Sequence, residues 1–243
     1  MRRYLPTLIG LSIAAAAAFA AWPAPVVEAP RAPVATVDVA ATKRQLAGAI
    51  ALLAIAHDQQ RVGALADERQ AETGLRIASA ARLLYTRPLG GFRDDCSGFA
   101  SAALSLAGVA ADGTVATLYD RAIANDALRW SDPRPGDLVF FDDTHDRDDD
   151  GGGGDALTHV GIVVDVDPDG VAHFLQAGTR RGRTDGVIDV ERPSMHRDAD
   201  GKLLNSYLRA PRSWDASETA YLAGELWAGF GRVDAGHDWL GPR

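Results

Sequence analysis

The hydrophobic pattern of this chain changes near residue 137. Before that point apolar residues recur at helical spacing, in 41–57, in 75–85 and in a segment from Cys96 to Gly108. After it, short runs rich in β-branched and aromatic residues predict strands. The predicted strands are 137–141, 159–166, 172–176, 186–190 and 206–209. Helices followed by strands favour an α+β fold with helices packed on a central antiparallel sheet, rather than alternating βαβ units.

The first twenty residues predict an export signal. Arg2 and Arg3 precede a largely apolar, Ala-rich run that ends in Ala18-Phe19-Ala20, and Trp22-Pro23 follows directly. The run is short for a transmembrane helix, so we predict a cleaved signal peptide over 1–20 and no stable membrane span afterwards. A retained anchor is the alternative. The expected location of the protein is the periplasm or cell envelope.

Composition and periodicity divide the remainder. Residues 21–40 are rich in Pro, Ala and Val and predict a linker, and 41–69 predict an N-terminal helical extension. The principal domain is expected over 70–210. A C-terminal helical extension is predicted over 211–243, because a capping-box-like pair precedes apolar residues at helical spacing. The pair is Asp215 and Glu218, and the apolar residues are Tyr221, Leu222, Leu226, Trp227 and Phe230.

The chain is acidic, and its acidity is concentrated in one loop. The net charge is −8 and becomes −10 when Arg2 and Arg3 are removed, which argues against nucleic acid as a partner. Seven aspartates and one arginine fall within residues 142–155. Asp146, Asp148 and Asp150 copy the start of a calcium loop, but Leu157 stands where a bidentate Glu is needed. We therefore predict a solvated loop with no metal and no cofactor, with calcium at these three aspartates as the alternative.

Cys96 is the only cysteine of the 243 residues, so it forms no internal disulfide. It stands at the start of a predicted helix, where unpaired backbone N–H groups lower a thiol pKa and stabilise an oxyanion. Ser97 and Gly98 beside it are small and leave room for a substrate. These features predict a nucleophile, and the alternative is an inert, buried cysteine.

His159, at the start of the strand His-Val-Gly-Ile-Val-Val, is the candidate base for this thiol. Gly161 lies on the same face and would leave a clearance beside the imidazole. Gln176 on the next predicted strand could accept the imidazole N–H and fix its tautomer. His173 is the alternative third residue, although alternation puts it on the opposite face of a regular strand. No histidines have the spacing of a zinc site.

Three motifs, taken in order, resemble those of the NlpC/P60 family of papain-like cell-wall cysteine peptidases. They are Asp-Cys-Ser-Gly-Phe from Asp95, Pro-Gly-Asp-Leu-Val-Phe-Phe from Pro135, and His-Val-Gly-Ile from His159. The resemblance covers about 70–210. It implies a papain-like fold in which Cys96 is the nucleophile and His159 is the base.

The same resemblance assigns further residues. Phe174-Leu175-Gln176-Ala177 matches the register of the family's third polar residue and implies that role for Gln176. Tyr85, ahead of Gly90-Gly91, matches a tyrosine whose hydroxyl lies near the substrate carbonyl. Asp95 and Ser97 are expected at the substrate or oxyanion site.

The implied function is that of an exported cysteine peptidase, which hydrolyses peptidoglycan stem peptides at or near the bond between D-glutamate and a diamino acid. The alternatives are a catalytically weak wall-binding module, and an amidase or acyltransferase that uses the same Cys-His chemistry. Two insertions, 142–157 and 192–205, depart from the family pattern and are expected near the mouth of the cleft. A regulatory or targeting protein is a possible further partner. The oligomeric state is not predicted.

Overall fold

The computed structural model describes residues 39–87, 90–148, 153–179, 182–213, 215–234 and 239. The predicted signal peptide and all but the last two residues of the predicted linker lie outside this part of the chain. Two compact units are distinguished, 1–52 and 53–243. In the described residues the first unit consists only of helical residues 39–52, whereas the second holds the sheet and its packed helices. None of the described helices is both long and apolar enough to cross a membrane.

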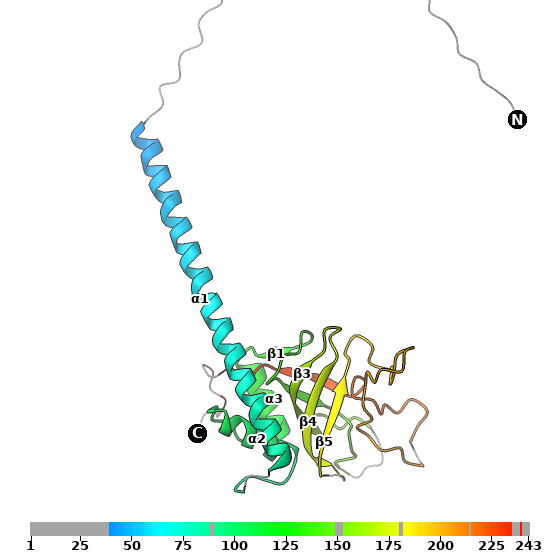
Figure 1. The fold of residues 1–243 in the computed structure, drawn as a ribbon. Helices are drawn as coiled ribbons and strands as arrows, with labels where there is room; N and C mark the ends of the chain where they lie inside the picture. Colours follow the sequence, from blue (N-terminus) through cyan, green and yellow to red (C-terminus); the bar gives the residue numbers. More distant parts are fainter. Residues whose placement is uncertain are drawn as a thin grey trace, which may run out of the picture. The chain divides into compact units, whose positions relative to one another are not determined.

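The described elements are three helices and six strands (Figure 1). They are α1 (Val39–Thr86), α2 (Cys96–Leu106), α3 (Val115–Ala124), β1 (Leu128–Arg129), β2 (Leu138–Phe141), β3 (His159–Val166), β4 (Ala172–Thr179), β5 (Gly182–Ile188) and β6 (Trp227–Gly231). The strands form one antiparallel sheet in the order β1-β6-β2-β3-β4-β5. The predicted α+β class and antiparallel sheet are therefore confirmed.

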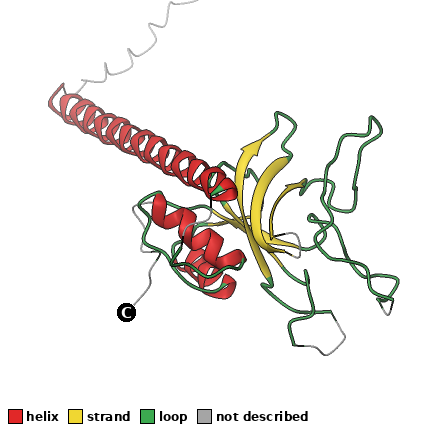
Figure 2. Cartoon of the chain, turned by 60° about the horizontal axis from the view of Figure 1, so that its bottom comes forward, coloured by secondary structure: helices red, strands yellow, loops and turns green. Residues whose placement is uncertain are grey.

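Alternation along the strands builds a separate core on each face of the sheet. Leu138, Phe140 and Val160 point to the face covered by α2, α3 and the last turns of α1. Val139 and Phe141 point to the other face, which is covered by loop residues between β5 and β6. Figure 2 shows this arrangement, with helices on one side of the strands and long loops on the other.

Two predictions about helices are corrected. The segments 41–57 and 75–85 belong to one continuous helix of 48 residues, because strong helix formers fill the interval between them. The predicted domain boundary at 69/70 therefore falls inside α1. The predicted C-terminal helix is wrong, since the segment holds β6 and the described residues beyond 211 contain no helix.

A glycine and a local turn explain why the segment that contains β6 forms a strand and not a helix. Gly229 has a φ of 125° and pairs within the sheet, a backbone conformation that a helix cannot use. The Glu225 carboxylate accepts the backbone N–H groups of Tyr221 and Leu222, each at 3.1 Å, and closes a turn ahead of β6. The predicted strand 206–209 is likewise reduced to a single bridge between Tyr207 and Leu222.

Helix α1 packs closely against the Pro135-Gly136 turn. A Cβ at Gly74 would collide with the carbonyl oxygen of Pro135, and one at Gly136 would collide with the Gly74 backbone. Gly136 also has a φ of 92°, which only glycine adopts without strain. The Pro135-Gly136 turn that precedes β2 is therefore in direct backbone contact with helix α1.

We expect Gly74→Ala to lower the free energy of unfolding by about 1–3 kcal/mol, because the added methyl group forces the helix away from the turn. Gly63→Ala is the matched control on the same helix, since nothing lies within 4 Å of a Cβ there. That change is expected to raise stability by up to about 1 kcal/mol through helix propensity. Urea titrations of both variants measure the difference, and equal effects would contradict the close contact.

Candidate active site

The position of Cys96 is set by the start of α2. Asp95 is the N-cap, and its Oδ1 accepts the Gly98 N–H at 2.6 Å and the Ser97 hydroxyl at 2.9 Å. Gly98 is required by packing, because a Cβ there would collide with the carbonyl oxygen of Arg93. The cap and this contact together hold Cys96 in the first turn of the helix.

The Cys96 thiol is partly buried and lies against the sheet. The backbone N–H groups of Val160, of Ser97 and of Cys96 itself are directed at its sulfur. Gly178 of β4 approaches from another side, and a Cβ at Gly178 would lie 2.8 Å from the Cys96 nitrogen. Since Val160 directly follows His159, the sulfur lies beside the backbone at the start of β3.

His159 and Gln176 are both buried and hydrogen-bonded to each other. The distance from His159 Nε2 to Gln176 Oε1 is 2.6 Å, and because the amide oxygen only accepts, Nε2 carries the proton. Nδ1 is then the nitrogen with a free lone pair. The alternative third residue, His173, instead contacts Asp167 at 3.0 Å and pairs with Asp165 on β3. The structure therefore joins Gln176, not His173, to His159.

The space that was predicted beside the His159 imidazole at Gly161 is filled by the side chain of Phe174. A Cβ at Gly161 would lie 2.8 Å from the ring of Phe174, which fills that space. The Phe141 ring completes the layer, with centroids 5.4 Å from Phe174 and 6.2 Å from His159. Gly161 thus makes room for the Phe174 ring, and the predicted clearance is filled.

Burial is the largest influence on the pKa of Cys96 and on that of His159. Burial raises the pKa of Cys96, against the opposing N–H of Val160, and the Asp95 charge raises it further. Burial lowers the pKa of His159 to about 4, although its hydrogen bond to Gln176 opposes this. The expectation of a lowered thiol pKa from the helix start is therefore wrong. Both groups are therefore neutral at pH 7.

Because the thiol pKa is raised, alkylation of folded Cys96 by iodoacetamide should keep accelerating above pH 8.5, with no plateau near neutrality. The same protein unfolded in urea is the control, and its thiol should titrate near the ordinary value of about 8.5. A reaction in which His159 is the base requires the neutral imidazole, so the acid limb of its rate should fall only as pH drops through about 4. An alkylation plateau at pH 6–7 would reveal a preformed thiolate–imidazolium pair and contradict this account.

A cleft of about 750 Å³ opens beside the start of α2. Asp95 and Gly98 of the α2 start line it, as do Gly178 of β4 and Arg183 of β5. Arg93 and Arg183 were not anticipated from sequence, since their place in the cleft depends on how distant segments pack. The remaining lining residues are Leu84, Gly90, Phe92, Asp94, Phe99, Ala102, Ala177 and Gly182.

The predicted substrate residues have structural partners in this arrangement. The Tyr85 hydroxyl donates to Asp185 Oδ1 at 3.5 Å. Ser97 is buried, where it donates to Asp95 and accepts from Arg93 Nη2 at 3.1 Å. Of the three predicted substrate residues, Asp95 alone lines the cleft, and contact of any of them with substrate stays a prediction.

Carboxylates of the acidic loop, residues 142–155, form contacts with other groups of the chain. Asp146, Asp148 and Asp155 offer oxygen atoms within 4.8 Å of one another, whereas Asp150 lies outside the described residues. Asp155 accepts the Arg147 N–H at 2.9 Å, and Arg212 lies 3.4 Å from Asp146. The guanidinium groups of Arg212 and Arg147 offset part of the negative charge of the cluster. Asp155 is buried, so the loop is not wholly solvated as predicted.

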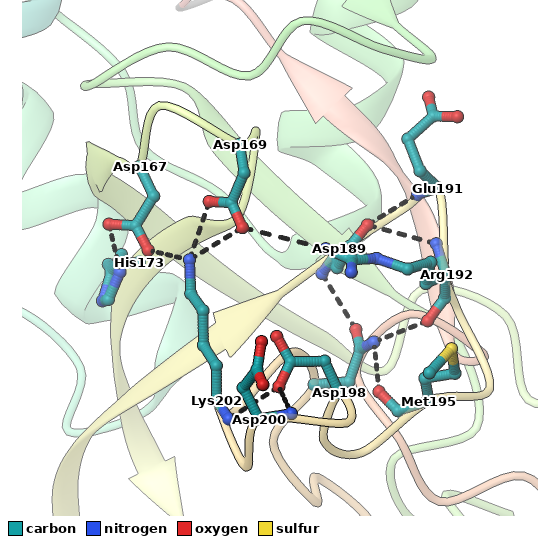
Figure 3. Close-up of polar contacts among 11 residues, drawn as sticks. Asp167, Asp169, His173, Asp189, Glu191, Arg192, Met195, Asp198, Asp200 and Lys202 are labelled. Carbon is teal, nitrogen blue, oxygen red and sulfur yellow. Dashed lines mark hydrogen bonds and ion pairs between the residues drawn. The ribbon is translucent and has the colours of Figure 1, made fainter.

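The second insertion, 192–205, lies elsewhere than predicted. Lys202 Nζ pairs with Asp167 and Asp169, each at 2.7 Å, and Arg192 pairs with Asp189 at 2.7 Å (Figure 3). These bonds hold the insertion at the β3–β4 turn, the opposite end of β3 from His159. No described residue of the insertion lines the cleft.

Comparison of the chain with protein-family models, curated proteins and solved structures gives no match.

Proposed function

We propose that this protein is an exported cysteine peptidase that hydrolyses amide bonds in peptidoglycan stem peptides. The observation that supports this most is the hydrogen bond of 2.6 Å from His159 to Gln176. It fixes the proton on Nε2 and leaves Nδ1 free, while Cys96 stands at the start of α2 with the backbone N–H of Val160, the residue after His159, directed at its sulfur. Nucleophilic catalysis by a thiol requires a histidine oriented in this way, and we propose that His159 and Cys96 form this pair.

In the proposed reaction, His159 Nδ1 takes the thiol proton while the Cys96 sulfur attacks the scissile carbonyl carbon. Backbone N–H groups at the start of α2 stabilise the oxyanion. When the C–N bond breaks, the imidazolium returns the proton to the leaving amine, and a thioester remains. Water, deprotonated by His159, then hydrolyses the thioester and restores the thiol. Gln176 holds the imidazole in the required tautomer throughout.

The substrate class is proposed from the motifs around Asp95, Pro135 and His159, which resemble the NlpC/P60 family. The predicted signal peptide agrees with a substrate outside the cytoplasm, in the periplasm or cell envelope. We propose the bond between D-glutamate and the diamino acid as the scissile one. The papain-like arrangement and the family membership belong to the same proposal.

A wall-binding module with weak or no activity is the second candidate, and the raised pKa of Cys96 favours it. A synthetic stem tetrapeptide, incubated with the mature protein and followed by mass spectrometry, separates the candidates. Cleavage into a D-glutamyl dipeptide and a diamino-acid dipeptide supports the peptidase. Saturable binding without cleavage would identify the binding module, and transfer of the acyl group to an added amine would identify an acyltransferase.

A further inference from the structure

Arg183 is a cationic side chain of the cleft with unused binding capacity. It is the second residue of β5, its side chain is 26% exposed, and it lines the cleft. Its ion pair with Asp94 Oδ1 is long, at 3.9 Å, and the Asp94 side chain is 98% exposed. The Nε of Arg183 is buried and finds no hydrogen-bond acceptor among the described residues. A largely desolvated guanidinium with so weak a partner is unusual, because buried charge is normally paired.

The second arginine of the cleft provides the contrast. Arg93 donates to Ser97 Oγ and to the carbonyl oxygen of Gly113, and it lies 3.4 Å from both Asp95 and Asp112. Its guanidinium is therefore committed to holding the start of α2 and the segment ahead of α3. Arg183 is the arginine that remains available to a ligand.

Arg183 lies near the start of α2, the helix that carries the proposed nucleophile Cys96. Its neighbour Gly182 pairs with Thr179 at the end of β4, and adjacent Gly178 contacts the Cys96 backbone. Paired strands are about 4.8 Å apart, so Arg183 lies about one strand spacing from the residue that touches Cys96. Its partner Asp94 is two residues before Cys96 in the chain. Cys96 itself is not among the residues that line the cleft, so a group bound by Arg183 lies in the cleft beside the start of the helix that carries Cys96.

We infer that Arg183 binds a carboxylate of the substrate close to the scissile bond and makes the enzyme selective for stem peptides whose D-glutamyl residue keeps its free α-carboxylate. This inference rests on the proposed function. A guanidinium binds a carboxylate through two parallel hydrogen bonds, and Nε is one of the donors that such a pair uses. In the absence of substrate the Asp94 carboxylate pairs with the Arg183 guanidinium, and it competes with the substrate carboxylate for this cation.

The test compares two synthetic stem peptides that differ in one group, a D-glutamyl α-carboxylate or the corresponding carboxamide. Cleavage is measured as kcat/KM with active protein, and binding is measured by calorimetry with Cys96→Ala. The wild type should prefer the carboxylate by at least about tenfold. Arg183→Gln should bring the ratio close to one, whereas Asp94→Asn should maintain or increase it. Arg69→Gln, at an exposed arginine bonded to Leu65 on α1, is the control that leaves the ratio unchanged.

The outcomes separate this inference from the proposed function. Cleavage of both peptides without a preference, or a preference that survives Arg183→Gln, overturns the inference and leaves the peptidase intact. An Arg183-dependent preference in binding with no cleavage supports the inference and overturns the peptidase. If folded protein neither binds nor cleaves either peptide, both fail. Circular dichroism of Arg183→Gln establishes that the variant is folded.

Discussion

Replacing Cys96 with alanine is expected to reduce kcat/KM for stem-peptide hydrolysis by at least about 10³-fold, because the covalent route through the thioester is lost. The change removes one sulfur atom from a partly buried position, and no hydrogen bond that holds the N-cap of α2 involves it. The fold should therefore persist. The rate is measured by chromatography of the released peptides.

Cys96→Ser is the closer control for size and polarity. Its hydroxyl is a far weaker nucleophile than a thiolate, so this variant should also lose nearly all activity. Thermal unfolding of both variants should stay close to that of the wild type. Hydrolysis by folded Cys96→Ala at a rate within tenfold of the wild type would show that Cys96 is not the nucleophile.

Replacing Arg232 with methionine is expected to lower the free energy of unfolding by about 3–5 kcal/mol, because it leaves a buried carboxylate without its charged partner. Arg232 and Asp137 are 7% and 2% exposed, and two hydrogen bonds of 3.3 and 3.2 Å join them. Burial raises the pKa of Asp137, and Arg232 opposes that shift. Asp137 also accepts the Arg134 N–H at 2.9 Å, so the pair ties the turn before β2 to the residue after β6.

Urea titration measures the loss, with Arg134→Met as the matched control. Arg134 pairs with Asp132 at 3.0 Å, but both side chains are largely exposed, so this change should cost less than about 1 kcal/mol. The double variant Arg232→Met with Asp137→Leu should recover much of the loss, since both charges are then gone. A cost for Arg232→Met as small as that of Arg134→Met would contradict a buried, coupled pair.

The elements that sequence predicted well are those whose local pattern agrees with their tertiary setting. The run from His159 to Val166 is β3 residue for residue, and α2 begins at Cys96 behind its Asp95 cap. Alternation along β4 also separated Gln176 from His173, and the structure joins Gln176 to His159. Each of these depends on short-range geometry, which the sequence encodes directly.

The predictions that were wrong, and the residues that were missed, depend on contacts between segments far apart in the sequence. Apolar residues between Tyr221 and Phe230 fit a helix, but the segment finds hydrogen-bond partners on β1 and β2 and becomes β6. The helix start was expected to lower the thiol pKa, yet burial against β3 outweighs the nearby N–H groups. Arg183 and the pairing of Arg232 with Asp137 were missed because they join segments 89 or more residues apart.

Digestion of purified peptidoglycan by the wild type and by Cys96→Ala, with mass spectrometry of the soluble products, tests the central claim most directly. The wild type should release peptides with a new amine on the diamino acid and a new carboxylate on D-glutamate, and Cys96→Ala should release none. Equal release by the two proteins, or intact stem peptides after incubation with folded wild type, would contradict it.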